Sequence, residues 1–453
     1  MASDARSSDS SAATTGPLMS APTHNLRDAI EYAAASDVGL RRANNQDSFV
    51  AVVSPDEHEW LRRGHLFMVA DGMGAHAAGE LASKMATDFV SLTYYKAPDE
   101  SPVDALRFAF QDANERVFSR GQSNPDFRGM GTTSSALLIL PEGALVAHVG
   151  DSRVYRFRAN RLDQLTFDHS LVWEMQASGQ MRDADIQLNV PKNIITRSLG
   201  PYAEVQVDLE GPFPIQVGDS FLLCSDGLSG QVDDEEIGCI LGNLPPSEAI
   251  QALIDLANLR GGPDNVTVIG VRIAGPLTVG DAAAVAAPVR SRSAVGQKTV
   301  HPFSWITLGV LVLTALAMAF VGNLLLAATV GAAAIIAGIF IAVQHFSISA
   351  TARLDGKQLG KGPYRTTNCA ASASIVERLA KVVKQLHDAA AEEDWQIDWD
   401  RFKGYEAKAM AANQRQNYSE TVRQHCHAIT FMMDQLRHQS RHQHDTGDYP
   451  TNG

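Results

Sequence analysis

Five aspartates stand at the expected ends of buried strands or beside a glycine, and this placement could gather them around a cation. They occur in Asn45-Gln46-Asp47, Ala70-Asp71-Gly72, Gly150-Asp151-Ser152, Ser225-Asp226-Gly227 and Pro263-Asp264-Asn265. A carboxylate at a buried strand end is costly unless it is paired or binds a metal. Carboxylate, carbonyl and water oxygens are the ligands that Mg²⁺ and Mn²⁺ prefer, whereas zinc favours softer ones. Together the five aspartates predict a divalent-cation site, although a single Asp-Gly is more often an ordinary turn.

The stretch around Asp71 shows how the chain builds such a turn. The apolar run 65–70 predicts a buried strand that ends at Asp71, and helical spacing follows it. The small residues after Asp71 let the backbone and a ligand approach closely, which leaves the next carbonyl unobstructed. A strand-to-helix turn with an N-capping aspartate is the alternative interpretation.

The elements that must position these aspartates alternate in blocks. Apolar and extended runs predict strands at 31–36, 47–53, 65–70, 133–140, 144–150, 153–158, 221–225 and 266–273, with short extended pieces at 194–198 and 204–210. Helical spacing is found at 81–95, 103–121, 170–179, 233–242 and 246–260. Strand blocks separated by helices favour an α+β domain in which two sheets pack face to face with helices outside.

Length, charge and cysteine content limit the number of domains, the partners and the compartment that can be expected. A chain of 453 residues has room for two or three domains, and its net charge of −13 argues against nucleic acid as a partner. Residues 28–275 hold 35 Asp and Glu against 19 Lys and Arg, whereas residues 276–453 hold 14 against 17. Four scattered cysteines without a C-x-x-C pair indicate reduced cytosolic thiols. Residues 1–26 are expected to be a disordered tail, and they contain no signal peptide.

The motifs resemble those of the metal-dependent type 2C (PPM) protein Ser/Thr phosphatases, in their bacterial form. The resemblance covers about residues 28–273, within a domain expected at 27–275. It rests on Gly39-x-x-Arg42-x-x-Asn45-Gln46-Asp47, Asp71-Gly72-Met73-Gly74, Gly131-Thr132-Thr133, Gly150-Asp151-Ser152-Arg153, Thr166-x-Asp168-His169-Ser170, Thr196-Arg197-x-Leu199-Gly200, Ser225-Asp226-Gly227-Leu228 and Asp264-Asn265-Val266-Thr267. The family implies a four-layer α-β-β-α sandwich with two metals in a cleft at one end.

The resemblance also implies a metal-binding role for several residues. Asp71 would bridge two Mn²⁺ or Mg²⁺ ions, and the carbonyl of Gly72 would bind one of them. Asp226 and Asp264 would hold the other ion. Asp151 resembles the ligand of a third, weaker ion.

Three further residues resemble groups that act on the substrate or on water. Asp47 resembles the acid that orients metal-bound water, and Arg42 the arginine that binds the substrate phosphate. His76 lies three residues beyond Met73, where some relatives have a histidine, and it is a candidate proton donor to the leaving oxygen. It is equally a residue of a helix's first turn. The polar segment 180–191 resembles the family's mobile flap, a site of substrate selection.

The chemistry that follows is hydrolysis of phosphoserine and phosphothreonine on cytosolic proteins, opposing a Ser/Thr kinase. Two divalent ions about 4 Å apart would lower the pKa of a bridging water and clamp an in-line displacement at phosphorus. Two departures, Gln46 where many members have Glu and Ala75 where a Gly is usual, leave another hypothesis open. The chain could be a catalytically weakened phosphoprotein-binding regulator. A third hypothesis is a stress-signalling phosphatase acting on an anti-sigma-type regulator.

A long apolar run follows the linker 276–302. Residues 303–346 include no Asp, Glu, Lys or Arg over 44 positions, and one membrane span needs ~20 residues. The run therefore predicts two transmembrane helices that turn at Gly322-Asn323. Basic residues on both flanks favour cytoplasmic positions for both ends, hence a multi-pass protein of the cell membrane. The alternative is a buried globular hairpin, which would need a large partner domain.

Residues 347–453 are expected to be a mostly helical region of unknown role, interpreted as an interaction module. Helices are predicted at 372–392 and about 400–438 as an antiparallel pair, with Trp395 and Trp399 at their junction. Residues 354–369 predict a short β-hairpin or loop. His425-Cys426-His427 invites a metal interpretation, but adjacent helical residues point in different directions, which favours a core or solvated histidine pair.

Overall fold

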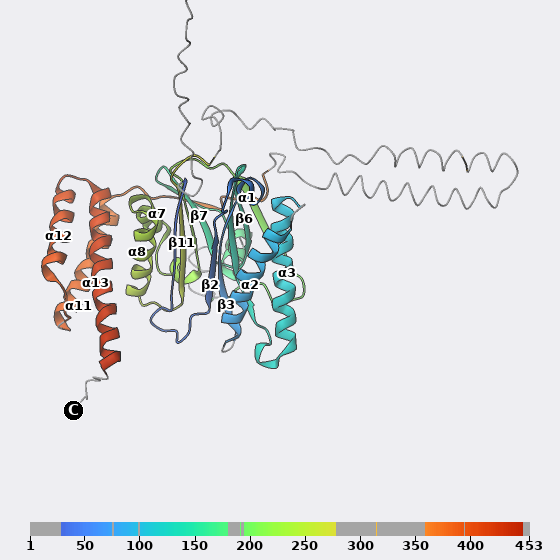
Figure 1. The fold of residues 1–453 in the computed structure, drawn as a ribbon. Coiled ribbons are helices and arrows are strands. Elements are labelled where there is room, and N and C mark those ends of the chain that lie inside the picture. Colours follow the sequence, from blue (N-terminus) through green and yellow to red (C-terminus); the bar gives the residue numbers. More distant parts are fainter. Residues whose placement is uncertain are drawn as a thin grey trace, which may run out of the picture.

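Two antiparallel sheets of six strands each pack face to face, with helices on both outer sides (Figure 1). This architecture comes from a computed structural model that describes residues 29–74, 77–97, 100–179, 191, 194–277, 314, 358–393 and 395–446. The predicted α+β class and the face-to-face arrangement of the sheets are confirmed.

The strand order places the two halves of the sequence together. The first sheet runs β1 (Ile30–Asp37), β11 (Val266–Ile273), β10 (Ser220–Cys224), β7 (Arg153–Arg158), β8 (Arg161–Gln164) and β12 (Arg365–Asn368). The second runs β2 (Asp47–Val52), β3 (His65–Met73), β5 (Ser134–Leu140), β6 (Gly143–Val149) and β9 (Asp208–Phe213), with β4 (Gly131–Thr132) beside β3. Each strand that ends at a predicted cation ligand lies inside a sheet rather than at its edge.

The side chains of β3 show why the sheets stack. Phe67 and Val69 pack into the core between the two sheets, against Phe221 and Ile269 of the first sheet. Met68 lies in a separate core under the helices of the second sheet. Successive strand residues point to opposite faces, so a strand that is apolar at every position is covered on both sides.

Helices cover the outer faces of the two sheets. α2 (Ala78–Lys96) and α3 (Pro102–Ser123) lie on the second sheet, and α7 (Asp234–Asn243) and α8 (Pro246–Leu259) lie on the first. The remaining elements of this part are short, namely α1 (Glu57–Arg63), η2 (Pro125–Phe127), α4 (Leu171–Ser178) and α6 (Asp226–Ser229). α1 and β8 were not predicted from the sequence. The turn between β7 and β8 has positive φ at Ala159 and Asn160 without a glycine, so the usual hairpin signal is missing.

The C-terminal region adds a fifth layer to the expected four. It consists of α11 (Ala373–Glu392), α12 (Trp399–Gln414) and α13 (Tyr418–Thr446), outside α7 and α8 (Figure 1). The predicted single helix over 400–438 is two helices, because the chain turns at Gln416, whose φ is +57°. Phe402, Cys426 and Met432 are buried in the same core as the inner face of α8. This region is therefore packed as part of the sandwich.

Residues 358–369, here called the C-terminal strap, tie this region to both sheets. β12 within the strap pairs with β8, so that Arg365 lies opposite Gln164, which replaces the predicted hairpin or loop. Leu359 exchanges backbone hydrogen bonds with Gly211 of β9. The buried carboxylate of Glu210 accepts hydrogen bonds from the backbone N–H groups of Lys361 and Gly362, both at 2.9 Å.

The predicted transmembrane hairpin at 303–346 lies outside the described residues, apart from Thr314. The expected tail 1–26 and nearly all of the linker 276–302 also lie outside them. Among the helices that the structure does describe, none combines the length and apolar character that a bilayer crossing requires.

The buried ion pair between α8 and α13 allows a test of this packing. Asp255 is fully buried, and its carboxylate accepts hydrogen bonds from Arg437 at 2.6 Å and Gln251 at 3.1 Å. Arg437→Leu would leave a buried charge without its counter-ion, so we expect a loss of about 3 kcal/mol in the free energy of unfolding. Adding Asp255→Asn should restore most of the lost free energy of unfolding. Denaturant unfolding at pH 7 measures both.

A lower pH should reduce the loss of stability caused by Arg437→Leu. Burial raises the pKa of Asp255, and Arg437 opposes that rise. Without Arg437 the carboxyl takes up a proton at higher pH in the folded state than in the unfolded state, so the loss shrinks as the pH falls. Arg116→Leu, which breaks an exposed pair with Asp112, is the control and should cost under about 1 kcal/mol. An equal loss in both variants would contradict the assigned role of the Arg437–Asp255 pair.

Candidate active site

The turn after β3 fixes Asp71 through its backbone. Its carbonyl accepts hydrogen bonds from Thr133 N at 2.8 Å and Thr132 Oγ1 at 2.9 Å, and its N–H donates to Thr133 Oγ1 at 2.9 Å. Asp47 lies directly opposite Asp71 on the neighbouring strand β2. Two carboxylates that are far apart in sequence therefore stand side by side at one end of the second sheet.

Gly72 is required by close packing at this turn. A Cβ atom there would lie 2.0 Å from the carbonyl oxygen of Gly79 and 2.5 Å from that of Gln46. The Gln46 carbonyl also accepts hydrogen bonds from Gly72 N at 3.1 Å and Ser83 Oγ at 2.6 Å. No other residue fits, so the Asp-Gly pair in the sequence reflects a real steric constraint.

Asp226 comes from the first sheet, at the end of β10. The preceding Ser225 donates from Oγ to Asp47 Oδ2 at 2.8 Å, and it accepts from Thr267 N at 3.0 Å. The other oxygen of Asp47 and the Oδ1 of Asp226 are shielded from solvent and have no hydrogen-bond partner. Ser225 thus joins the two sheets at the site, a role that the sequence analysis did not assign.

The loop before β11 places Asp264 near Arg42. Their side chains form an ion pair with Nη2 and Oδ2 2.7 Å apart, and the Arg42 side chain is 48% exposed. The side chain of Asn265 accepts from Gln46 N at 2.8 Å and donates to Val38 O at 2.8 Å. Gly39 has a φ of +77°, and a Cβ there would lie 2.2 Å from the Asp264 carbonyl oxygen. These contacts explain the glycine and the asparagine of two of the motifs.

Asp151 lies in the turn between β6 and β7. It is 7% exposed, and its Oδ1 has no hydrogen-bond partner. The preceding Gly150 donates from N to His169 Nδ1 at 3.0 Å, and His169 Nε2 lies 2.9 Å from Asp208 Oδ2. The histidine network that supports this turn was not predicted, although His169 stands in one of the quoted motifs.

The carboxylates influence one another electrostatically. Burial raises the pKa of Asp47 to about 7 and that of Asp151 to about 8, and the charge of Asp226 adds to both rises. Burial also raises the pKa of Asp71 well above its usual range, and Asp47, Asp226, Asp151 and Asp264 raise it further. The pKa of Asp226 is raised by burial and by Asp264. These five residues are called the acidic cluster, and their mutual repulsion is only partly offset, since the charges of Arg42 and Arg153 lower the pKa of Asp226.

The acidic cluster fits a divalent cation by its donor atoms. Three buried carboxylate oxygens, from Asp47, Asp151 and Asp226, have no partner. As arranged, no group of three or more His, Cys, Asp or Glu side chains within the described ranges could itself hold a metal ion.

Two predicted features lie outside the described residues. They are His76, the candidate proton donor, and the segment 180–191 apart from Pro191. The structure brings together the other predicted residues, namely Arg42, Asp47, Asp71, Gly72, Asp151, Asp226 and Asp264.

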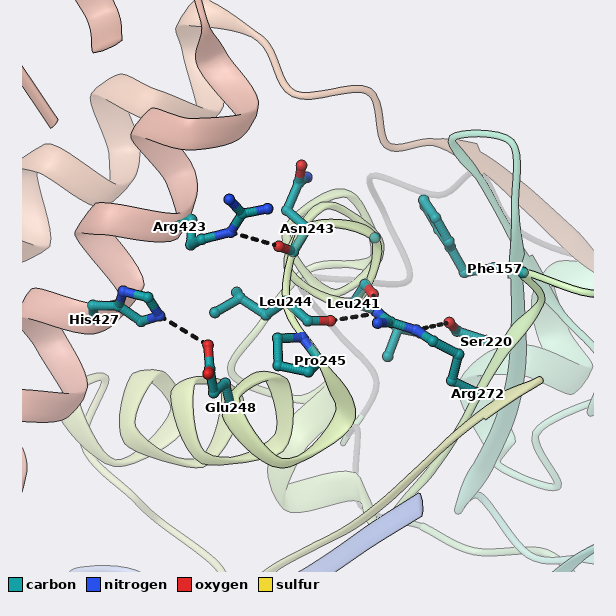
Figure 2. A pocket seen from close by; sticks show the side chains of 12 residues that line it. Phe157, Ser220, Leu241, Asn243, Leu244, Pro245, Glu248, Arg272, Arg423 and His427 are labelled. Atoms are coloured by element: carbon teal, nitrogen blue, oxygen red, sulfur yellow. Dashed lines mark hydrogen bonds and ion pairs between the residues drawn. The ribbon is translucent and has the colours of Figure 1, made fainter. Parts of the chain in front are cut away.

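A pocket of about 470 Å³ lies elsewhere, between α13 and the turn from α7 to α8 (Figure 2). His427 contacts Glu248 at 2.8 Å, and Arg423 donates to Asn243 O at 3.2 Å. Arg272, which also lines the pocket, is near the end of β11 that is far from Asp264. The pocket is therefore distinct from the acidic cluster. His427 uses its ring to join α13 to α8, which favours the non-metal interpretation of His425-Cys426-His427.

Known proteins with similar sequences are protein phosphatases. The sequence profile of the family described as Protein phosphatase 2C matches residues 41–255. A putative protein phosphatase 2C-type of Streptococcus pyogenes is 38% identical over 244 residues, which cover 51% of this chain and 93% of the relative. The protein phosphatase PhpP of Streptococcus pneumoniae is 36% identical over 245 residues, covering 53% of this chain and 96% of PhpP.

A solved structure is also similar. It is the catalytic domain of the serine/threonine protein phosphatase PstP in complex with two manganese ions. It is 35% identical in sequence and covers 54% of this chain and 99% of its own, with a TM-score of 0.47.

Removing one charge from the acidic cluster should stabilise the protein when divalent cations are absent. Asp71→Asn relieves the repulsion on four neighbouring carboxylates, so we expect an increase of several degrees in Tm in the presence of a chelator. Adding Mn²⁺ should raise the Tm of the wild type and leave that of the variant nearly unchanged. Thermal unfolding measures both.

The pH dependence follows from the raised pKa values. Between about pH 4 and pH 8 the folded metal-free protein holds protons on Asp47 and Asp151 that the unfolded chain has lost, so its stability falls as the pH rises. Asp88→Asn, on an exposed side chain of α2, is the control and should shift neither curve. A full Mn²⁺ response in Asp71→Asn would contradict the assignment of Asp71.

Proposed function

The chain belongs to the protein phosphatase 2C family and is a protein serine/threonine phosphatase, and on this premise we propose that it acts on cytosolic phosphoproteins at the acidic cluster. The observation that carries the proposal is the convergence of five carboxylates from two sheets, three of them with a buried oxygen that has no partner. Such a group requires positive charge, which a divalent cation provides.

Mn²⁺ or Mg²⁺ suits these ligands. Asp71 and the Gly72 carbonyl, with Asp226 and Asp264, would hold two ions, and Asp151 would hold a third, weaker one. When bound, such ions would supply a water of lowered pKa as the nucleophile and positive charge against the phosphoryl group. Ser225 holds Asp47 by one oxygen, which leaves the other free to accept a proton.

Arg42 is the proposed phosphate-binding residue. Its half-exposed guanidinium is now paired with Asp264, at the rim of the acidic cluster. Its Nη2 contacts Asp264, and the guanidinium has further N–H groups that can donate to two phosphate oxygens. The proposed phosphate-binding group thus adjoins the acidic cluster. His76 remains the proposed proton donor to the leaving serine or threonine oxygen.

The alternative of a regulator that binds phosphoproteins without hydrolysing them rests on Gln46. Gln46 is hydrogen-bonded to Asn265 through its backbone N–H, and to Gly72 and Ser83 through its backbone carbonyl. A glutamine in place of a glutamate therefore keeps the scaffold that positions Asp47 and Gly72. This favours an active phosphatase over a regulator that only binds phosphoproteins. A stress-signalling phosphatase acting on an anti-sigma-type regulator would use the same site and differ only in its substrate.

We further propose that residues 303–346 anchor the protein in the cell membrane as two helices, with the catalytic and C-terminal regions in the cytoplasm. The pairing of β12 with β8 supports this topology. Residues 358–446 must lie on the same side of a membrane as the acidic cluster, so any crossing in between must occur an even number of times. Basic residues on both flanks favour the cytoplasmic side.

Phosphate release from a phosphothreonine peptide tests the enzymatic proposal. The full-length protein should release phosphate only with Mn²⁺ or Mg²⁺. Asp71→Asn should reduce kcat by roughly a hundredfold or more, because it removes the charge shared between the ions. The same substitution should stabilise the metal-free fold, so the loss cannot come from unfolding.

Asp88→Asn is the matched control and should keep wild-type activity. Near-wild-type turnover by Asp71→Asn at saturating Mn²⁺ would show that the site is wrongly assigned. A wild-type protein that binds Mn²⁺ and phosphopeptide but releases no phosphate would favour the regulator instead.

Reporter fusions test the topology. A reporter after Ser293 and one after Gly453 should both show a cytoplasmic location, with the protein in the membrane fraction. A reporter inserted between Gly322 and Asn323 should show the opposite side, which serves as the control. A non-cytoplasmic signal from the fusion after Gly453 would exclude the hairpin, and recovery of the chain in the soluble fraction would exclude the anchor.

A further inference from the structure

Trp173 on α4 contacts two arginines that are far apart in the sequence. The guanidinium carbon of Arg153 is 5.7 Å from the centre of its ring, and that of Arg365 in the C-terminal strap is 4.8 Å away. Both arginines also approach Asp234 at the start of α7, each with an N–O distance of 3.8 Å. The strap therefore holds α4 and α7 through one positive charge.

The strap reaches the same tryptophan by a second contact. Tyr364 packs against Phe167 with ring centres 5.4 Å apart, and Phe167 packs edge-on against Trp173 at 5.5 Å. Arg365 thus contacts α4 directly, and its neighbour Tyr364 reaches α4 through Phe167. The position of this short helix depends on a segment well beyond the family match, which ends at residue 255.

From Trp173, one set of contacts leads to Asp151. Arg153 forms an ion pair with the buried Asp168 at 2.7 Å, and it donates to Tyr155 Oη at 2.9 Å. Tyr155 in turn donates to Asp234 Oδ1 at 2.9 Å. Because Arg153 follows Asp151 by two residues at the start of β7, this network braces the turn that carries Asp151.

A second set of contacts leads from α4 to Asp71. Glu174, the neighbour of Trp173, accepts a hydrogen bond from Thr196 Oγ1 at 2.6 Å. Three residues farther along the chain, Leu199 exchanges backbone hydrogen bonds with Thr132 at 2.9 and 3.0 Å. Thr132 Oγ1 donates to the Asp71 carbonyl at 2.9 Å. α4 is therefore connected to both turns that carry proposed cation ligands.

We propose that Arg365 is a positioning residue for the acidic cluster, acting through Trp173 and Asp234 on the turns of Asp71 and Asp151. This inference rests on the proposed function, since it concerns the cation affinity of that cluster. Arg365 is 46% exposed and its contacts with Asp234 are long, so its loss should cost the fold little. Its effect should fall on the geometry of the cluster.

Mn²⁺ binding to the full-length protein in detergent tests the proposal. Calorimetry should show Mn²⁺ affinity about three- to tenfold weaker in Arg365→Ala than in the wild type, with a similar rise in the Mn²⁺ concentration for half-maximal activity. The kcat at saturating Mn²⁺ should change less. Arg365→Lys keeps a cation over Trp173 and should recover most of the affinity. The Tm in the presence of a chelator should stay within about 2 °C of the wild type.

Lys361→Ala is the matched control. It removes a positive charge from the same strap, where only the backbone N–H of Lys361 contacts Glu210, so Mn²⁺ affinity should not change. Wild-type affinity in Arg365→Ala would overturn this inference and leave the proposed function intact. Weaker affinity with a large drop in Tm and no recovery in Arg365→Lys would overturn it as well, because Arg365 would then be only structural. Absence of Mn²⁺ binding by the wild type would overturn the proposed function and this inference with it.

Discussion

Repulsion among the carboxylates of the acidic cluster is the constraint on which the rest of the structure depends. Asp47 and Asp71 belong to the second sheet, and Asp151, Asp226 and Asp264 adjoin strands of the first. The cluster therefore exists only while the two sheets remain packed. The apolar core between the sheets has little freedom to relax, so the charged groups cannot separate. The packing of the two sheets must therefore offset the destabilising repulsion at the site, as functional sites commonly require.

Local patterns in the sequence predicted most of the sandwich and the aspartates that the structure brings together in the acidic cluster. Aspartates at strand ends are visible because apolar runs stop there and a glycine follows, and Gly72 shows that the glycine is a steric necessity. Contacts between distant segments were not predictable in this way. Ser225 joins Asp47 across the two sheets, and the polar strand β12 has no apolar alternation that identifies β8 as its neighbour. The turn at Gln416 also lacks the glycine or proline that usually marks one.

The boundary expected at residue 275 separates parts of the chain that packing unites. Leu253 of α8 lies in one core with Phe402 of α12 and Cys426 of α13. Asp255 of α8 uses Arg437 of α13 as its buried counter-ion. The C-terminal helices are thus a structural layer of the phosphatase rather than a separate module.

The pairing of β12 with β8 also determines when the fold can be completed during synthesis. Their register joins Arg365 to Gln164 across about 200 residues, and about 80 residues separate the end of the catalytic segment from the strap. The entropy of closing so long a loop grows slowly with its length, so equilibrium stability is affected little. The order in which parts of the chain fold during synthesis is affected more. A nascent chain that has emerged only to residue 277 still has an unpaired strand edge at β8 and an uncovered apolar face on α7 and α8. Its final packing must therefore wait for the last helix to leave the ribosome.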